Sequence, residues 1–89
     1  MSHLLIRHKV ADFDQWKPVY DAHQSAREDA GLKVLHLWSS EYDPNEVLIL
    51  FETSDVAKAK ELISSTDLKE KMQASGVQGT PDIVFLSEK

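Results

Sequence analysis

Five consecutive apolar residues, Val47 to Phe51, constrain the fold of this 89-residue chain more than any other segment. Successive side chains of a strand point to opposite faces, so an unbroken apolar run predicts a strand covered on both faces. The run follows Asp43-Pro44-Asn45, whose residue types are typical of a type I turn. Before this turn, the segment Leu32–Glu41 carries apolar residues at positions of both parities. The sequence therefore predicts a hairpin that needs cover on two sides.

The first thirty residues predict a strand followed by a helix. The apolar start of Leu4–Val10 is typical of a strand. From Phe13 the spacing changes to three and four, and a wide stripe forms on one helical face; its members are Phe13, Trp16, Tyr20, His23, Ala26, Arg27 and Ala30. Asp12 with Gln15 resembles a capping box, and Gly31 suits the end of the helix. Pro18 would break a helix interior, so a kink or a late start is expected there.

The last third of the chain predicts a broken helical segment and a final strand. Ser54 is a good helix N-cap before an apolar face that runs to Ser64. A second short helix is expected from Asp67, which forms a box-like pair with Glu70, to Gly76. After a Gly- and Pro-containing stretch, the segment Pro81–Leu86 is expected to be a strand.

The predicted order is β-α-β-β-α-β, which with right-handed crossovers gives an α+β, ferredoxin-like fold. Its four-stranded antiparallel sheet carries both helical segments on one face. A chain of this length is expected to form a single domain over residues 1–89. Leu35 and Leu37, or their neighbours of opposite parity, would then be exposed on the open face together with half of Val47–Phe51. A homodimer through this open face would cover them.

Charge and composition exclude several classes of function. Ten Lys plus Arg against fifteen Asp plus Glu give a net charge of −5, which disfavours nucleic acid and anionic membrane surfaces as partners. The chain has no Cys, so disulfides, thiolate metal sites and a Cys nucleophile are excluded. The apolar run near the N-terminus is too short for a signal peptide or a membrane span. A cytoplasmic protein is expected.

Aromatic and His residues interrupt the apolar pattern and indicate a possible ligand pocket. Trp16, Tyr20 and His23 fall on the helix face expected to turn toward the sheet. His36 and Trp38 share one side of their strand; if that side faces the helices, they would join the same space. Such half-polar aromatic lining is typical of small-molecule sites, so these residues are candidate ligand-binding residues. The alternative is that the stripe is ordinary core whose polar tips reach a carbonyl or water.

His8 and His36 are the candidate catalytic residues. Imidazole titrates near neutrality, so a His beside a bound phenol or enol could remove its proton. Alternatively, each is a strand histidine satisfied by backbone groups. The four His residues lack metal-ligand spacing, and no nucleotide-binding or serine-hydrolase motif is present. No metal and no cofactor are therefore predicted.

Several segments together resemble the small, cyclase-like branch of the antibiotic biosynthesis monooxygenase superfamily. They are His8–Lys17, with His8, Asp12 and Trp16 as the most specific residues, then Asp43-Pro44-Asn45-Glu46, Ala74-Ser75-Gly76-Val77 and Pro81-Asp82. The resemblance covers nearly the whole chain. It implies a dimeric α+β barrel with two sheets packed face to face and a ligand cavity between sheet and helices in each subunit.

The resemblance implies several activities rather than one, because relatives with this fold include cofactor-independent oxygenases of polyketide-like phenols, haem-degrading enzymes and isomerases. The haem-degrading relatives typically use a His on the second helical segment, and residues 54–75 contain none. Two functions that use this cavity are therefore carried forward, beside a purely structural or interaction role in which the aromatic stripe fills the core. One is a cofactor-independent monooxygenase or cyclase acting on a small aromatic or polyketide-like molecule. The other is a non-catalytic binding or accessory dimer that uses the same cavity.

Overall fold

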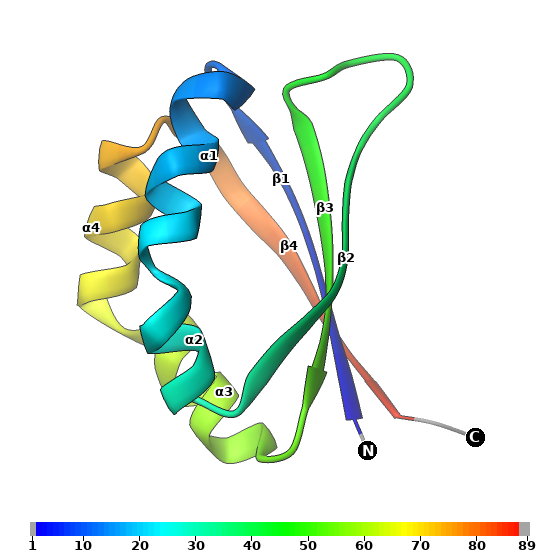
Figure 1. Cartoon of the computed structure of the whole chain (residues 1–89), viewed down its shortest axis with the longest axis vertical. Helices are drawn as coiled ribbons and strands as arrows, with labels where there is room; N and C mark the ends of the chain where they lie inside the picture. The colour runs from blue at the N-terminus through cyan, green and yellow to red at the C-terminus, as the bar shows by residue number, and fades with distance from the viewer. Residues whose placement is uncertain (1, 88–89) are drawn as a thin grey trace.

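The computed structural model describes residues 2–87 and confirms the predicted βαββαβ order (Figure 1). Its elements are β1 (Ser2–Val10), α1 (Phe13–Ala22), α2 (Gln24–Asp29), β2 (Leu32–Ser39), β3 (Glu46–Thr53), α3 (Val56–Ser64), α4 (Thr66–Ala74) and β4 (Val77–Ser87). Met1, Glu88 and Lys89, the outermost residues of the expected domain, lie outside the described part of the chain.

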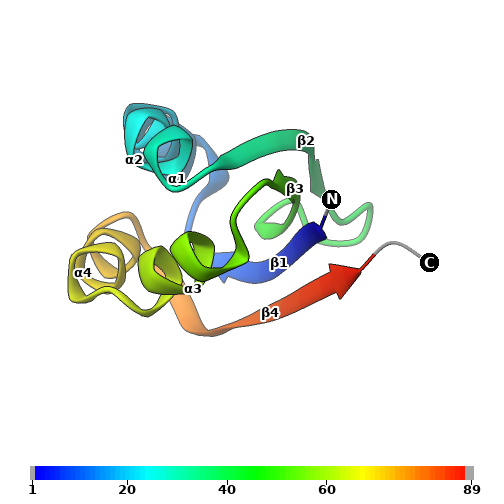
Figure 2. The ribbon, with the colours of Figure 1, turned by 90° about the horizontal axis from the view of Figure 1, so that it is seen from below.

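The four strands form one antiparallel sheet in the order β2-β3-β1-β4, and all helices lie on one of its faces (Figure 2). The predicted α+β, ferredoxin-like fold is confirmed. Alternate residues of β1 and β3 point toward the helices and form most of the core: Leu4, Ile6, Val10, Val47, Ile49 and Phe51. The helices form two pairs, α1 with α2 and α3 with α4, which lie side by side over the sheet (Figure 2).

The first helical segment is broken at His23 and not at Pro18. The prediction of a late start at Pro18 was wrong, because α1 begins at Phe13 and continues past Pro18, an exposed residue inside it; the alternative of a kink there stays a prediction. At the break, the Tyr20 carbonyl accepts from the His23 backbone N–H at 3.1 Å and from the Arg27 Nη1 at 2.7 Å. The Arg27 side chain thus satisfies a carbonyl at the end of α1, where helix carbonyls lack intrahelical donors.

The helix caps differ in part from those predicted. Asp12 caps α1 as expected, and its carboxylate accepts from the Asp14 backbone N–H. The predicted cap Ser54 is wrong by one residue, because Asp55 accepts from the Lys58 backbone N–H at the start of α3. The start of α4 was placed too late. Ser65 caps this helix, two residues before the predicted Asp67, by accepting from the backbone N–H of Leu68.

Both helix-ending glycines are placed as predicted, and the last strand is longer than expected. Gly31 and Gly76 adopt φ values of +76° and +93°, a region that residues with a Cβ rarely enter. Strand β4 begins at Val77, four residues before the predicted Pro81. Pro81 is tolerated inside it because β4 is an edge strand and the register with β1 shifts between Gln78 and Asp82, so Pro81 has no partner in the ladder.

A bulge in β2 decides which face its aromatic residues occupy. Val34 pairs with Phe51, but the register then shifts, and His36 pairs with Leu50. Since Phe51 points to the helices and Leu50 does not, the shift turns His36 and Trp38 to the open face. The prediction left open whether Leu35 and Leu37 or their neighbours would face away from the helices. In the structure, Leu37 lies on the helix side and its neighbours His36 and Trp38 face away.

The open face of the sheet has an apolar centre, with charged residues such as Arg7 and Glu46 beside it, and is covered by no element of residues 2–87 (Figures 1 and 2). Leu5, Leu48 and Leu50 lie at its centre, as the register of β1 and β3 shows. Around them, Trp38 is 47% exposed, Val84 47% and Leu86 39%. In the described part of the chain, no helix combines the length and the hydrophobicity needed to cross a membrane.

Candidate functional site

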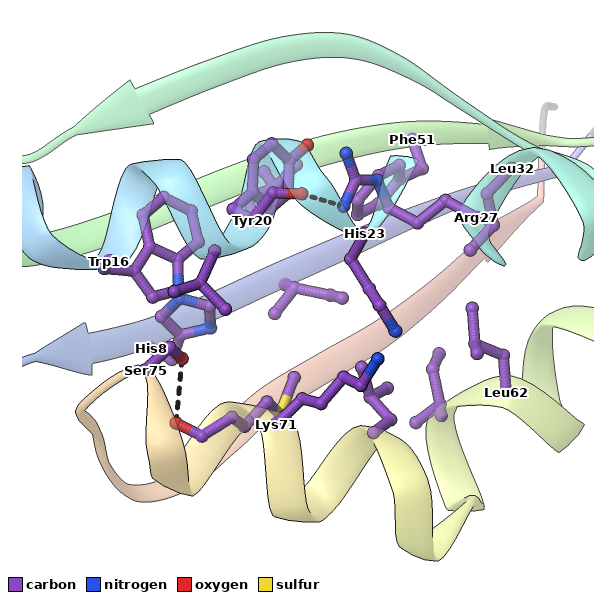
Figure 3. Close-up of a pocket in the computed structure, with 16 residues that line it drawn as sticks. His8, Trp16, Tyr20, His23, Arg27, Leu32, Phe51, Leu62, Lys71 and Ser75 are labelled. Carbon is purple, nitrogen blue, oxygen red and sulfur yellow. Dashed lines mark hydrogen bonds between the residues drawn. The ribbon is translucent and has the colours of Figure 1, made fainter. Parts of the chain in front are cut away.

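A pocket of about 80 Å³ lies between the two helix pairs, with the sheet as its floor (Figure 3). Strands supply Ile6, His8, Leu32, Ile49 and Phe51; the first helical segment supplies Trp16, Val19, Tyr20, His23 and Arg27; the second supplies Leu62, Ile63, Leu68, Lys71, Met72 and Ser75. Most of these side chains are apolar. Four of the six predicted site residues, His8, Trp16, Tyr20 and His23, line this one space.

His8 is the unusual residue of the pocket floor. Its side chain points to the helix face between Ile6 and Val10, and the residue is only 5% exposed. Neither Nδ1 nor Nε2 has a hydrogen-bond partner among the described residues, although both atoms are buried. Burial lowers the pKa of His8 below its usual value of 6.5, so the imidazole is neutral at pH 7. A buried polar group without a partner is costly, and ligand sites are where proteins retain such groups.

The junction between β1 and α1 fixes the position of His8 and Trp16. The Val10 backbone N–H donates to the Asn45 carbonyl at 2.8 Å, and the Phe13 backbone N–H donates to the Asn45 Oδ1 at 2.9 Å. The Ala11 backbone N–H donates to the Gly76 carbonyl at 2.8 Å. These bonds tie the start of α1 to the hairpin turn and to the end of α4. Asn45 and Gly76 thus help to orient the pocket without lining it.

A row of aromatic side chains begins at His8 on β1 and continues along α1. The His8 and Trp16 rings meet edge to face with centroids 5.3 Å apart, and Trp16 stacks on Tyr20 at 4.8 Å. Trp16 is 3% exposed and belongs to the core. The buried Tyr20 hydroxyl has no partner among residues 2–87, and burial raises its pKa. The pocket therefore has two unpartnered polar groups, on His8 and Tyr20, within an apolar wall.

The sequence analysis missed two basic residues of the pocket, Arg27 and Lys71. Arg27 was placed in the helical stripe but not proposed as a site residue, and its guanidinium packs on the Tyr20 ring at 3.8 Å. Lys71 reaches the pocket from α4 and points toward His23 (Figure 3). Burial, then Lys71, lowers the pKa of His23. Position 27 continues the stripe, so its spacing was the available signal; nothing in the sequence marks Lys71.

His36 and Trp38 do not line this pocket. Their rings stack on each other with centroids 4.8 Å apart, on the sheet face opposite the helices. They were expected to join the cavity only if their side of β2 faced the helices, and the β2 bulge turns that side away. Within residues 2–87, no three His, Cys, Asp or Glu side chains lie close enough together to hold a metal ion.

Solved structures with the same fold cover the whole length of the chain. A candidate antibiotic biosynthesis monooxygenase from Bordetella bronchiseptica aligns with a TM-score of 0.77 over 99% of this chain and 96% of its own, at 12% sequence identity. Another from Caulobacter crescentus aligns with a TM-score of 0.74 over 99% of this chain and 89% of its own, at 17% identity. This chain has the antibiotic biosynthesis monooxygenase fold.

A solved structure with a different description also has this fold. An uncharacterized NIPSNAP domain protein from Burkholderia xenovorans aligns with a TM-score of 0.67 over 100% of this chain and 95% of its own, at 11% identity. The sequence itself matches no protein-family model and no curated protein. Identities this low establish the fold alone, so function must be argued from the pocket.

Proposed function

We propose that this protein binds a small phenolic molecule in the pocket between its helix pairs, with the phenol hydroxyl against His8. The observation that carries this proposal is the buried, neutral His8 with both ring nitrogens unpartnered. A phenol would place its ring against Trp16 and donate its O–H to a ring nitrogen. This contact satisfies the orphaned group, and the apolar wall takes the ring.

The pocket volume sets the size of the ligand. About 80 Å³ is roughly half of a ~150 Å³ cavity that accommodates benzene. A single ring therefore enters when a few lining side chains move. The wall formed by α4 suits such movement, because none of its residues, Thr66–Ala74, is fully buried. Met72 is an unbranched, adaptable side chain at this wall.

As an enzyme, the protein would oxygenate a phenolate without a cofactor. With hydroquinone, His8 takes the phenolic proton, and a ring carbon of the resulting anion forms a bond to O2. The peroxide takes up a proton and loses water, and the product is hydroxybenzoquinone. Hydroquinone plus O2 thus gives hydroxybenzoquinone plus water, with O2 as the only oxidant. The lowered pKa of His8 makes the imidazole a weak base. However, the imidazolium and the phenolate formed by the proton transfer are in direct contact and shielded from water, which strengthens their attraction.

A non-catalytic binding protein is the second candidate. It is favoured by the absence of any carboxylate among the residues that line the pocket, which leaves His8 without a partner that could orient it or share its proton. The same pocket would then hold its ligand without turnover.

The functional unit proposed is a homodimer formed through the open sheet face. The apolar centre of Leu5, Leu48 and Leu50 and the exposed Trp38 and Val84 support this assembly, because a patch spanning a sheet is larger than monomers usually expose. Packing two such faces together would leave each pocket on the outer, helical side of its own subunit. The cavities would remain separate.

His8→Phe tests the proposal, with His36→Ala as the matched control on the opposite face. 4-Methylphenol is titrated into the labelled protein and followed by NMR, and hydroquinone is incubated under ¹⁸O2. Wild type and His36→Ala should show shifts at pocket residues, and His8→Phe should not. Incorporation of ¹⁸O into hydroxybenzoquinone by wild type and not by His8→Phe supports the enzyme. Binding without incorporation supports the carrier, and equal binding by His8→Phe would refute the proposed contact.

A further inference from the structure

The lining of the pocket carries positive charge, although the chain as a whole is acidic. Arg27, Lys71 and His23 line the pocket, and no Asp or Glu does. The whole chain has a net charge of −5, so two cations, Arg27 and Lys71, without an acidic residue in the lining form a local exception. Local clusters of one sign attract ligands of the other.

Arg27 is a buried cation without an acidic partner. The residue is 9% exposed, and no carboxylate of residues 2–87 lies within 4.0 Å of its guanidinium. Two acids of the same helical segment have partners of their own: Asp21 binds Lys17 at 2.7 Å, and Glu28 accepts from Gln24 at 2.9 Å. Buried charges are normally paired, because removing them from water is costly.

The contacts of Arg27 leave most of its donors available. Its Nη1 donates to the Tyr20 carbonyl at 2.7 Å, and the guanidinium packs over the Tyr20 ring. A guanidinium has five N–H donors in a planar fork, which suits a carboxylate. The break between α1 and α2 thus holds Arg27 in place by one hydrogen bond while its other donors remain free for a ligand.

His23 and Lys71 complete the cluster from two sides. Figure 3 shows them pointing toward each other across the pocket. Both Lys71 and Arg27 act on His23 as like charges and lower its pKa. The single acidic neighbour is Asp67, whose carboxylate is 3.9 Å from the His23 Nε2 and largely exposed to solvent. One hydrated carboxylate outside the pocket lining does not balance the two cations, and the neutral His23 adds a hydrogen-bonding group beside them.

We propose that the pocket selects an aromatic acid, whose carboxylate binds Arg27, His23 and Lys71 while its phenol end reaches His8. This inference rests on the proposed function and names the substrate class of that same site. The length of the ligand follows from α1. Trp16, which contacts His8, lies seven residues before His23, a rise of about 10 Å along a helix. A hydroxyphenyl ring with a short carboxylate chain spans this distance.

The test compares 4-hydroxyphenylacetate with 4-hydroxyphenethyl alcohol, which has the same ring and chain length but no charge. Affinities are measured by calorimetry at low salt for wild type, Lys71→Met and Lys69→Met. Both variants remove one charge from α4, but Lys69 does not line the pocket. Wild type and Lys69→Met should bind the acid at least about tenfold more tightly than the alcohol, as expected for charge-assisted hydrogen bonds. In Lys71→Met this ratio should fall severalfold.

The outcomes separate this inference from the function on which it rests. Equal affinity of wild type for acid and alcohol would overturn the inference and leave the phenol-binding proposal intact. Binding of neither compound would overturn both. A preference for the acid that is the same in Lys71→Met and in Arg27→Gln would show that the carboxylate binds elsewhere, provided that both variants retain the circular dichroism spectrum of the wild type.

Discussion

A His–Trp pair lies on each side of the sheet, and the two pairs differ in ring geometry, burial and hydrogen bonding. On the helix face, His8 and Trp16 meet edge to face, and both residues are buried. On the open face, His36 and Trp38 stack in parallel, and Trp38 is 47% exposed. The first pair has unpartnered nitrogens in an apolar pocket; the second lies on a surface suited to another sheet. Residue type alone therefore does not mark a site; burial and unmet hydrogen bonding do.

The largest effect is expected from Trp16→Ala, which removes the larger member of the first pair, whose two members are both buried. The loss of a buried indole should lower the free energy of unfolding by about 3–5 kcal/mol. Urea denaturation followed by circular dichroism measures this loss. A change below about 1 kcal/mol would show that Trp16 is not core. Unchanged affinity for 4-methylphenol in a folded variant would restrict Trp16 to packing.

Trp38→Glu should have the next largest effect, on assembly. A Trp buried in an interface commonly contributes about 2 kcal/mol or more, so the dissociation constant of the proposed dimer should rise at least about 30-fold. Sedimentation velocity over a dilution series measures it. Tyr42→Glu is the control, because Tyr42 is 97% exposed in the hairpin turn. Equal dimerisation of Trp38→Glu and wild type would contradict assembly through the open face.

His8→Phe should be tolerated or stabilising, although His8 is buried. The ring contact with Trp16 is kept, the adjoining cavity takes the extra volume, and two unsatisfied nitrogens are lost, so a gain of about 1 kcal/mol at pH 7.5 is expected. Loss of stability with loss of the near-ultraviolet circular dichroism signal would show that the His8 nitrogens have structural partners.

The pH dependence of the same variant sharpens the result. The pKa of His8 is lower in the folded chain than its unfolded value of 6.5, so the unfolded state binds the extra proton. Wild type should therefore lose stability as the pH falls through 6.5, and His8→Phe should lose less. His23 has a pKa shift of the same direction and is present in both proteins, so it cancels from the difference.

His36→Ala should have the smallest effect. His36 is exposed, and its stack on Trp38 contributes to a surface and not to the core, so the free energy of unfolding should change by less than about 0.5 kcal/mol. Affinity for 4-methylphenol should not change. A loss of phenol binding in this variant would place the ligand on the open face and reverse the assignment of the two pairs.

The order of the elements could be predicted from the sequence because the hydrophobic periods of strand and helix differ. The apolar run Val47–Phe51 correctly predicted a strand, and the helices cover one of its faces; cover on the other face stays a prediction. The stripe from Trp16 to His23 lines one wall of the pocket. The parity of His36 could not be predicted. A single bulge inverts every later position of a strand, and no residue in Leu32–Ser39 marks it.

The charge in the pocket lining escaped prediction for a different reason. Arg27 and Lys71 belong to helices that are far apart in the sequence, and each is an ordinary basic residue of an amphipathic helix. Their relation becomes visible only when the two helix pairs lie over one sheet (Figure 3). Sites assembled from separate helices depend on tertiary structure and leave no local spacing.

The strand order has a consequence for how the chain folds. The central strand β1 pairs with β3 and β4, and Leu4 lies opposite Phe85, so β1 completes its ladder with a strand that is synthesised after every other element of residues 2–87. Closing a loop of nearly the whole chain gives a high contact order and predicts slow folding for so small a protein. During translation, one edge of β1 stays unpaired until β4 leaves the ribosome. The pocket wall formed by α4 should therefore be among the last parts to become ordered.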